Sequence, residues 1–311
     1  MTAPGTTPTA DGASVASAAS TAFADAVAGG HLDADALQVA DHVRAGVRGQ
    51  GPLGVAYSGG VDSATLLALA VHELGPGQVV AVLGVSPSLA AEERLAAHDV
   101  AGHIGARVIE VHTREGENPA YQRNGLDRCF HCKDELFSRI SDEVVTAHGL
   151  GAVAYGENAD DATRPDRPGS QAATNHRILR PLADAGASKA QVRAIARAFA
   201  LPCAEKPAAP CLASRIPHHQ SVTPEKLRQV ERVEAGLRAL GFSDCRVRHH
   251  GEVARIELVE GELERAWAPE MRAEVHLLAR DSGFAFAAVD VRGLQSGAFS
   301  LTLLGTEHAA S

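Results

Sequence analysis

One six-residue segment constrains the fold more than any other feature of the chain. Residues Ser58-Gly59-Gly60-Val61-Asp62-Ser63 follow an apolar run at 53–57 and lead into a helix-like apolar run at 64–70. A strand, a glycine turn and the start of a helix together form an anion site, because free N–H groups and the helix dipole both favour negative charge. The spacing is not that of a Walker A loop, which has four residues between its first glycine and Gly-Lys-Ser/Thr. We call residues 58–63 the glycine loop and expect it to bind phosphate.

Asp62 is the unexpected member of the glycine loop. A carboxylate beside phosphate groups needs a cation between them, and Mg²⁺ prefers such oxygen ligands. The sequence therefore predicts a phosphate site that also holds Mg²⁺. An ordinary strand-to-helix turn is the alternative interpretation.

Composition narrows the class of protein. The chain has 311 residues, a net charge of −9 and 4% aromatic residues, so Ala, Val and Leu build its core, which suits helices packed on a parallel sheet. The acidic balance argues against a nucleic-acid partner. No apolar run reaches about 18 residues and no signal peptide is evident, so we expect a cytoplasmic protein without a membrane partner. An odd count of five cysteines predicts thiol chemistry rather than a disulfide framework.

The pattern of apolar residues divides the chain into two folded parts. Strand and helix patterns alternate in the first part, which predicts a parallel α/β sheet with ligands at the carboxyl ends of its strands. Its expected strands lie at 53–57, 79–85, 107–111, 152–155 and 178–182, and its expected helices at 33–47, 90–103, 132–148 and 188–200. A helix from Pro224, strands at 245–249, 253–259 and 284–291 and a helix at 262–280 predict a smaller α+β part. We expect a disordered tail at 1–30, the α/β domain at 31–205, the α+β domain at 206–305 and a tail at 306–311.

Three cysteines lie in segments with chemical character. Cys129 and Cys132 are three positions apart, so both sulfurs can reach one metal or cluster, although zinc, redox and buried structural roles remain alternatives. Cys211 lies between Lys206 and Arg215, which favour a reactive thiolate, and a structural cysteine is the alternative. We expect the other two cysteines, Cys203 and Cys245, to be packing residues.

Several polar residues complete the candidate site. Asn158 and Asp160, with Asp161, follow an expected strand and could hold a metal or nucleotide group, although the same residues are also common in turns. Arg246 and Arg248 share one face of an expected strand and suit phosphate or carboxylate, with a solvated face as the alternative. Composition alone favours an ordinary surface position for Glu234.

Taken together, these segments resemble the PP-loop ATP pyrophosphatases, and among them the LarE family. That family consists of ATP-dependent sacrificial sulfur transferases that help to make the nickel-pincer nucleotide cofactor of lactate racemase. The resemblance extends from about Gly54 to Gly297. The segments that carry it are the glycine loop, Arg128-Cys129-Phe130-His131-Cys132-Lys133, Gly156-Glu157-Asn158-Ala159-Asp160-Asp161, Arg167-Pro168-Gly169, Lys206-Pro207, Pro210-Cys211-Leu212-Ala213-Ser214-Arg215 and Arg246-Val247-Arg248.

The resemblance implies a reaction and roles for these residues. ATP with Mg²⁺ would adenylate a carboxylate of pyridinium-3,5-biscarboxylic acid mononucleotide, and sulfur would then displace AMP to give a thiocarboxylate. Lys133 and Arg215 would offset charge on the phosphates. Arg246 and Arg248 would lie near the phosphate and carboxylate of the substrate, and Glu234 near the sulfur site. The family also implies a homo-oligomer, a trimer or hexamer.

The resemblance leaves two sources of sulfur open. In one version of the family, the cysteine that matches Cys211 gives up its own sulfur and becomes dehydroalanine. In the other, three cysteines hold a [4Fe–4S] cluster with one iron free for an extra sulfide. This chain has Cys129, Cys132 and Cys211, which favours the cluster version.

Three other functions would use some of the same residues. A PP-loop tRNA sulfurtransferase would explain the glycine loop and the paired cysteines, but the acidic composition counts against it. An ammonia-dependent amidating synthetase would also use the glycine loop. A metal chaperone with a vestigial ATP site is an alternative without catalysis.

Overall fold

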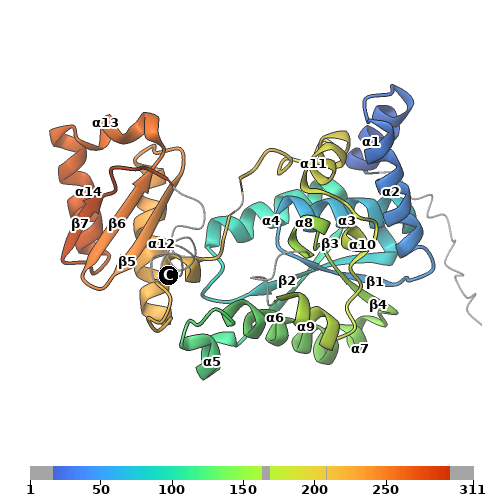
Figure 1. Cartoon of the computed structure of the whole chain (residues 1–311), viewed down its shortest axis with the longest axis horizontal. Helices are drawn as coiled ribbons and strands as arrows, with labels where there is room; N and C mark the ends of the chain where they lie inside the picture. Colours follow the sequence, from blue (N-terminus) through green and yellow to red (C-terminus); the bar gives the residue numbers. More distant parts are fainter. Residues whose placement is uncertain (1–16, 163–168, 208, 295–311) are drawn as a thin grey trace, which may run out of the picture.

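A parallel sheet of four strands organises the first part of the chain (Figure 1). The computed structural model describes residues 17–162, 169–207 and 209–294. The strands are β1 (Leu53–Tyr57), β2 (Val79–Val85), β3 (Arg107–His112) and β4 (Ala152–Tyr155), in the order β3-β2-β1-β4. Every residue of β1 is buried, as expected for a central strand covered on both faces. The α/β prediction is therefore confirmed, and three of these strands have the predicted bounds.

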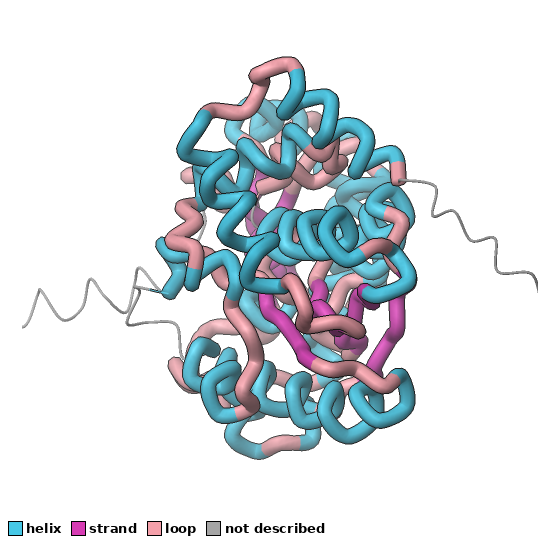
Figure 2. Tube along the Cα trace, turned by 90° about the vertical axis from the view of Figure 1, so that its right-hand side faces the viewer, coloured by secondary structure: helices cyan, strands magenta, loops and turns pink. Residues whose placement is uncertain are grey.

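Helices cover both faces of this sheet (Figures 1 and 2). One face shares a core with α1 (Ala18–Ala28), α2 (Ala34–Val47), α3 (Val61–Leu74), α4 (Ala91–Ile104) and α11 (Lys189–Ala198). The other face packs against α6 (Arg128–Arg139), the π-helical turn η3 (Ile140–Val145) that continues it, and α9 (Gly169–Asn175). Leu53, Val55 and Tyr57 of β1 belong to the first core and Ala56 to the second, because successive strand residues point to opposite faces.

Two expectations for this part of the chain were wrong. The expected tail at 1–30 contains α1, whose Phe23 is buried and stacks on Phe199 with ring centroids 4.2 Å apart; residues 1–16 lie outside the described residues. The expected strand at 178–182 is a single bridge between Leu179 and Ala154. Pro181 then begins the short helix α10 (Pro181–Asp184), because proline has no N–H group to continue a strand ladder.

The second part of the chain is a small α+β unit. Strands β5 (Cys245–His250) and β6 (Val253–Leu258) are antiparallel, and β7 (Phe286–Val289) runs parallel to β6. These strands share a core with α12 (Pro224–Ala239) and α14 (Pro269–Asp281). The single helix expected at 262–280 is divided, because Pro269 starts α14 after the short helix α13 (Leu263–Ala266). The predicted tail at 306–311 and the end of the predicted domain at 305 lie outside the described residues.

The remaining elements are short. They are η1 (Pro76–Gln78), η2 (Glu115–Glu117), α5 (Pro119–Gln122), α7 (Thr146–His148), α8 (Ala159–Ala162), η4 (Leu212–Arg215) and η5 (Glu260–Glu262). In the part of the chain that the structure describes, no helix combines the length and apolarity needed to cross a bilayer.

Direct hydrogen bonds join the two parts. The N–H of Leu212 donates to the carbonyl of Ser88 (2.9 Å), and the N–H of Val222 donates to the carbonyl of Gln122 (3.0 Å). A carboxylate oxygen of Glu231 on α12 accepts from the N–H of Ala91, the first residue of α4 (2.7 Å). Backbone bonds of this kind fix the segment around Cys211 against the α/β unit.

Candidate active site

The strand order reverses between β1 and β4, the place at which sheets of this kind have their ligand-binding crevice. The chain passes from β1 to β2 and β3 on one side, whereas β4 lies on the other side of β1. The segments that follow β1 and β4 therefore leave the sheet in opposite directions, and ligands of such sheets bind at this point, beyond the carboxyl ends of the strands. These segments are the glycine loop and residues 156–161, which we call the acidic loop. Asn158 of the acidic loop donates to a carboxylate oxygen of Asp62 (3.1 Å), so the structure brings the two predicted segments together.

Serine hydroxyls hold the glycine loop closed. The Ser63 hydroxyl accepts from the N–H of Ser58 (3.2 Å) and donates to the carbonyl of Gly60 (3.1 Å). Gly59 has a φ of 74°, and a Cβ atom there would lie 2.8 Å from the Cβ of Ala97. Helix α3 begins at Val61, and its N-cap residue Gly60 makes no side-chain cap hydrogen bond, an arrangement that suits an anion at the N-terminus of the helix.

Gly156 lets the acidic loop approach the glycine loop. A Cβ atom at Gly156 would lie 2.7 Å from the Cα and 2.8 Å from the N of Ser63. Only glycine permits such close backbone contact. The absence of a side chain at Gly156 therefore allows the acidic loop to contact the backbone of the glycine loop.

Lys189 is a further polar residue of the site and was not predicted from the sequence. Its ammonium lies 2.5 Å from a carboxylate oxygen of Asp62, and its N–H donates to a carboxylate oxygen of Asp160 (2.8 Å). The signal was present in the sequence, because Lys189 follows the N-cap Ser188 and a positive charge in the first turn opposes the helix dipole. Such a lysine needs an acidic or phosphate partner. Lys189 therefore joins Asp62, Asn158 and Asp160 in one polar network.

Lys133 lies on α6, on the opposite side of the sheet from α11. Its ammonium donates to the hydroxyl of Tyr155, the last residue of β4, and lies 4.1 Å from the centre of the Tyr155 ring. A Cβ atom at Gly169 would lie 2.5 Å from the same ammonium. Lys133 is thus held at the carboxyl end of β4, next to the acidic loop. Arg167 and Pro168, which precede Gly169 in the sequence, lie outside the described residues.

The two segments that hold the three predicted thiols are in contact, because Arg128, next to Cys129, donates to the carbonyl of Ala213, two residues after Cys211 (2.9 Å). Cys129 and Cys132 are on the first turns of α6, and Cys211 is the residue before η4. Burial raises the pKa of the Cys132 thiol well above its ordinary value, and the neighbouring charges of Glu115, Cys211 and Cys129 raise it further. Cys129 and Cys211 are exposed, whereas Cys132 is half-buried. The structure thus brings together segments that carry two accessible thiols and a more enclosed one.

Cys203 and Cys245 are buried, in agreement with their predicted packing role. Cys203 belongs to the core of the α/β unit and Cys245 to that of the α+β unit. Burial raises the pKa of both thiols, that of Cys245 to about 12. Neither thiol belongs to the candidate site.

Glu234 is not a surface residue. It is 2% exposed, and its two carboxylate oxygens accept from the guanidinium of Arg215 at 2.9 and 3.2 Å. One of them also accepts from the N–H of Val247 (2.9 Å). Arg215 in turn donates to the carbonyl of Cys211 (3.3 Å), so the pair supports the backbone at that cysteine.

The two strand arginines differ in their surroundings. Arg248 is 5% exposed; it forms a two-point ion pair with Glu257 (2.9 and 3.1 Å) and donates to the carbonyl of Ser214 (3.2 Å). Arg246 is half-buried and pairs with Asp244. Arg248 thus connects β5 to η4, which follows Cys211.

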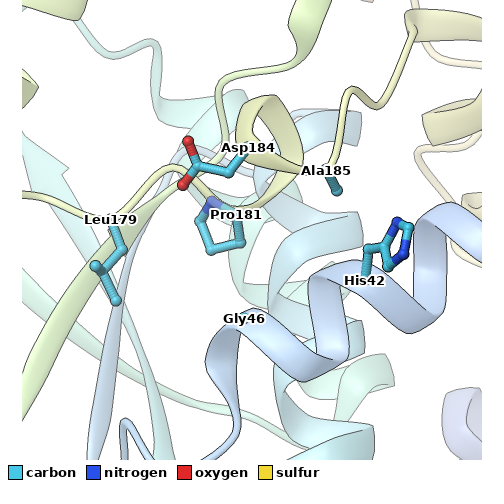
Figure 3. Close-up of a pocket in the computed structure, with 6 residues that line it drawn as sticks. All are labelled: His42, Gly46, Leu179, Pro181, Asp184 and Ala185. Atoms are coloured by element: carbon cyan, nitrogen blue, oxygen red, sulfur yellow. The ribbon is translucent and has the colours of Figure 1, made fainter.

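Neither the grouping of metal-binding side chains in the described residues nor the cavity between α2 and α10 identifies a site for a single metal ion. Within 17–162, 169–207 and 209–294, no three His, Cys, Asp or Glu side chains are grouped tightly enough to hold one metal ion. The three cysteines of a [4Fe–4S] cluster each bind a different iron, so their thiols need not converge on one point. Three thiols are therefore the right donor type for a cluster even where no single-ion site is found. A cavity of about 370 Å³ lies elsewhere, between α2 and α10, where His42 and Asp184 line it (Figure 3). None of the predicted site residues lines this cavity.

Comparisons with known proteins agree with this geometry. The asparagine synthase family matches residues 36–149, which include the glycine loop. The chain is 39% identical to an uncharacterized protein of Synechocystis over 80% of this chain and 92% of the relative. It is 32% identical to the pyridinium-3,5-bisthiocarboxylic acid mononucleotide synthase of Lactiplantibacillus plantarum, over 82% of this chain and 91% of that enzyme. With its glycine loop, its acidic loop and this relationship over most of its length, the chain belongs to the LarE family of ATP-dependent sulfur transferases.

Proposed function

We propose that this protein converts the carboxylates of pyridinium-3,5-biscarboxylic acid mononucleotide to thiocarboxylates, with sulfur supplied at Cys129, Cys132 and Cys211. The observation that carries the proposal is the contact between the two distant segments that hold these thiols: Arg128, next to Cys129, donates to the carbonyl of Ala213, two residues after Cys211 (2.9 Å). The name of the Lactiplantibacillus enzyme supplies the class of substrate. We also propose a cytoplasmic homo-oligomer, a trimer or hexamer, as the family resemblance implies.

The nucleotide half of the reaction belongs to the crevice between β1 and β4. The glycine loop and the first turn of α3 would bind the phosphates of ATP, and Asp62 would hold Mg²⁺ with Asn158 and Asp160 beside it. The substrate carboxylate attacks the α-phosphorus, the bond to the bridging oxygen breaks, and pyrophosphate leaves. Lys133, at the carboxyl end of β4, would offset charge on the attacked phosphate. The product is an acyl adenylate whose AMP is a good leaving group.

The sulfur half belongs to the three thiols. A [4Fe–4S] cluster held by three cysteines has one iron without a protein ligand, which can carry an extra sulfide. Cys129 and Cys132 would hold it from α6, and Cys211 from the segment before η4. Arg215, held by Glu234, supports the backbone of Cys211 and places a cation close to the site. Arg246 is the strand arginine better placed to meet an anionic substrate, because Arg248 is buried in its pair with Glu257.

A sacrificial Cys211 is the second candidate source of sulfur. In that route the Cys211 thiolate attacks the acyl adenylate and AMP leaves. Elimination across the Cα–Cβ bond then releases the thiocarboxylate and converts Cys211 to dehydroalanine. The exposure of Cys211 favours this route, because a nucleophile must reach its substrate.

One experiment separates these routes. Iron and acid-labile sulfide are measured on protein prepared without oxygen, for the wild type, Cys211→Ala and Cys203→Ala. The cluster route predicts about four irons per chain in the wild type and in the Cys203→Ala control, and their loss in Cys211→Ala. Intact mass is then measured after turnover with ATP, Mg²⁺ and the substrate.

Each outcome has a definite meaning. An unchanged mass after several turnovers supports the cluster route. Absence of iron, together with loss of the elements of H₂S at Cys211, supports the sacrificial route. Absence of both pyrophosphate release and thiocarboxylate formation would overturn the proposed function as a whole.

A further inference from the structure

The segment that holds Cys129 and Cys132 is tied to the segment that holds Cys211 by two buried polar residues. Arg128 is 8% exposed and Asn124 is fully buried. Arg128 donates through one guanidinium nitrogen to the side-chain oxygen of Asn124 (2.6 Å) and to the carbonyl of Ala213 (2.9 Å). Ala213 follows Cys211 by two residues, so this guanidinium spans both cysteine segments.

Asn124 makes the second half of the connection. Its side-chain amide donates to the carbonyls of Ile216 (3.2 Å) and Pro217 (2.8 Å). Its own carbonyl accepts from the N–H of His219 (3.1 Å). Asn124 has a φ of 56°, a left-handed conformation that asparagine tolerates better than most residues. Both the backbone and the side chain of Asn124 are therefore hydrogen-bonded to the segment that follows Cys211.

We propose that Arg128 and Asn124 form a clamp that positions Cys211 against Cys129 and Cys132. The two cysteine segments belong to different units, because α6 packs on the parallel sheet, whereas Leu212 and Ala213, which follow Cys211, pack in the core of the α+β unit. The clamp joins these units at the contact between the segment of Cys129 and the segment of Cys211. The inference rests on the proposed function, in which the three thiols act together.

The cost of burying Arg128 supports a specific role. A buried guanidinium needs partners for its charge and its donors, and an apolar side chain of similar size is often equally stable in such a position. The Arg128 guanidinium contacts the Cys211 segment at the carbonyl of Ala213, and Arg128 directly precedes Cys129 in α6. The charge of Arg128 thus lies at the contact between the two cysteine segments and not merely in the core.

Cross-linking tests the clamp without ATP, iron or substrate. Reduced, metal-free protein is treated with a short bismaleimide, and the linked peptides are identified by mass spectrometry. The wild type is compared with Arg128→Met and with Arg265→Met. Arg265 is the control, because its guanidinium also donates to two acceptors, here the backbone carbonyls of Leu240 and Gly241, and it is an exposed residue away from the thiols.

We expect Arg128→Met to lower the yield of the link between Cys211 and Cys129 at least fivefold, and Arg265→Met to leave it unchanged. Arg128→Lys should recover part of the yield, because lysine keeps the charge and its donors but has a flexible stem in place of the planar guanidinium. Wild-type yield in a folded Arg128→Met protein would overturn the proposal. Failure of sulfur transfer with normal cross-linking would instead count against the proposed function alone.

Asn124→Asp covers the case in which Arg128→Met does not fold. Aspartate keeps the shape and the acceptor for Arg128 but loses the donors to Ile216 and Pro217. A similar fall in the yield of the Cys211–Cys129 link supports the clamp. An undiminished yield in a folded Asn124→Asp protein contradicts it.

Discussion

The ammonium of Lys189 lies 2.5 Å from a carboxylate oxygen of Asp62, and this pair joins the first turn of α11 to the glycine loop. The two residues are 127 positions apart in the sequence. Asn158 donates to the other carboxylate oxygen of Asp62, so that carboxylate is held from two sides. A cation and a carboxylate arranged in this way can exchange partners when Mg²⁺ and phosphate enter, because Asp62 suits the metal and Lys189 suits the phosphate.

Lys189→Met should therefore weaken nucleotide binding. We expect the Kd of a non-hydrolysable ATP analogue with Mg²⁺ to rise about tenfold, or ~1.4 kcal/mol. The free energy of unfolding should change by less than ~1 kcal/mol, because the Lys189 side chain is 37% exposed and solvent screens the pair. Isothermal titration calorimetry and urea unfolding measure the two effects. Lys226→Met is the control, since Lys226 donates to the carbonyl of Ser221 outside the crevice; equal affinity in all three proteins would contradict the prediction.

The contact between Gly156 and Ser63 predicts a position at which one methyl group disrupts the site. Gly156→Ala brings its Cβ atom within 2.8 Å of two backbone atoms of Ser63, so the acidic loop must move away from the glycine loop. We expect a loss of about 1–3 kcal/mol in the free energy of unfolding and at least tenfold weaker ATP binding.

Gly102→Ala is the matched control for Gly156→Ala. Gly102 lies within α4, and no atom beyond its chain neighbours and the nearby backbone of its own helix lies within 4 Å of a Cβ atom built there. Alanine at that position should stabilise the protein by up to ~1 kcal/mol without changing ATP binding. Urea unfolding and calorimetry compare the two variants, and normal ATP binding by Gly156→Ala would show that the crevice tolerates a wider separation.

Much of the fold follows from local sequence patterns. The strands at 53–57, 79–85 and 152–155 were predicted with their observed bounds, because continuous apolar runs between glycines and polar turns mark buried parallel strands. The helix at 188–200 was predicted from its capping box, which the structure contains at Ser188 and Gln191. The glycine loop and the acidic loop could be placed at one edge, because both follow strands of a parallel sheet.

The parts that sequence reasoning missed depend on distant partners. Phe23 lies in a segment whose composition predicts disorder, and only its stacking on Phe199 shows why α1 is ordered. Glu234 is an ordinary helical carboxylate until Arg215 and Val247 are placed beside it. Lys189 lies in a predicted helix, but nothing local shows that it faces Asp62. Such pairings belong to the tertiary structure and leave little trace in a single sequence.

The buried pair of Arg215 and Glu234 should make a large contribution when one partner is removed. Arg215→Met leaves the Glu234 carboxylate buried with only the Val247 N–H as a close donor, and we expect the free energy of unfolding to fall by about 3–5 kcal/mol. Urea unfolding followed by circular dichroism measures this effect.

The double variant Arg215→Met/Glu234→Gln tests the cause of that loss. Glutamine removes the unpaired charge but keeps an acceptor for Val247, so the double variant should be more stable than Arg215→Met alone by ~1–3 kcal/mol. A double variant less stable than Arg215→Met would contradict the ion-pair explanation. A loss below about 1 kcal/mol in Arg215→Met would indicate that Arg238, 4.0 Å from Glu234, replaces the missing cation.

The thiols of the candidate site should differ in reactivity before any metal is bound. Burial, followed by the charges of Glu115, Cys211 and Cys129, raises the pKa of Cys132, so this thiol stays protonated in the range where ordinary thiols ionise. Because the thiolate is the nucleophile, we expect Cys132 to react with iodoacetamide much more slowly than the exposed Cys129 at pH 8. The alkylation rate of Cys132 should keep rising with pH beyond the point at which the rate of an ordinary thiol becomes constant. Peptide mass spectrometry of metal-free protein between pH 7 and pH 10 measures the rates.

Glu115→Gln tests the electrostatic part of this difference. The variant removes a negative charge next to Cys132, so the pKa of that thiol falls and its alkylation at pH 8 should become severalfold faster. Cys245 is the internal control, because burial and the charge of Glu234 raise its pKa to about 12 and it should stay unreactive. Equal rates for Cys132 and Cys129 in the wild type would contradict the prediction. A thiol that holds its proton this firmly gives it up when a cation replaces it, so occupation of the site should release a proton from Cys132 and protect it from alkylation at every pH in the series.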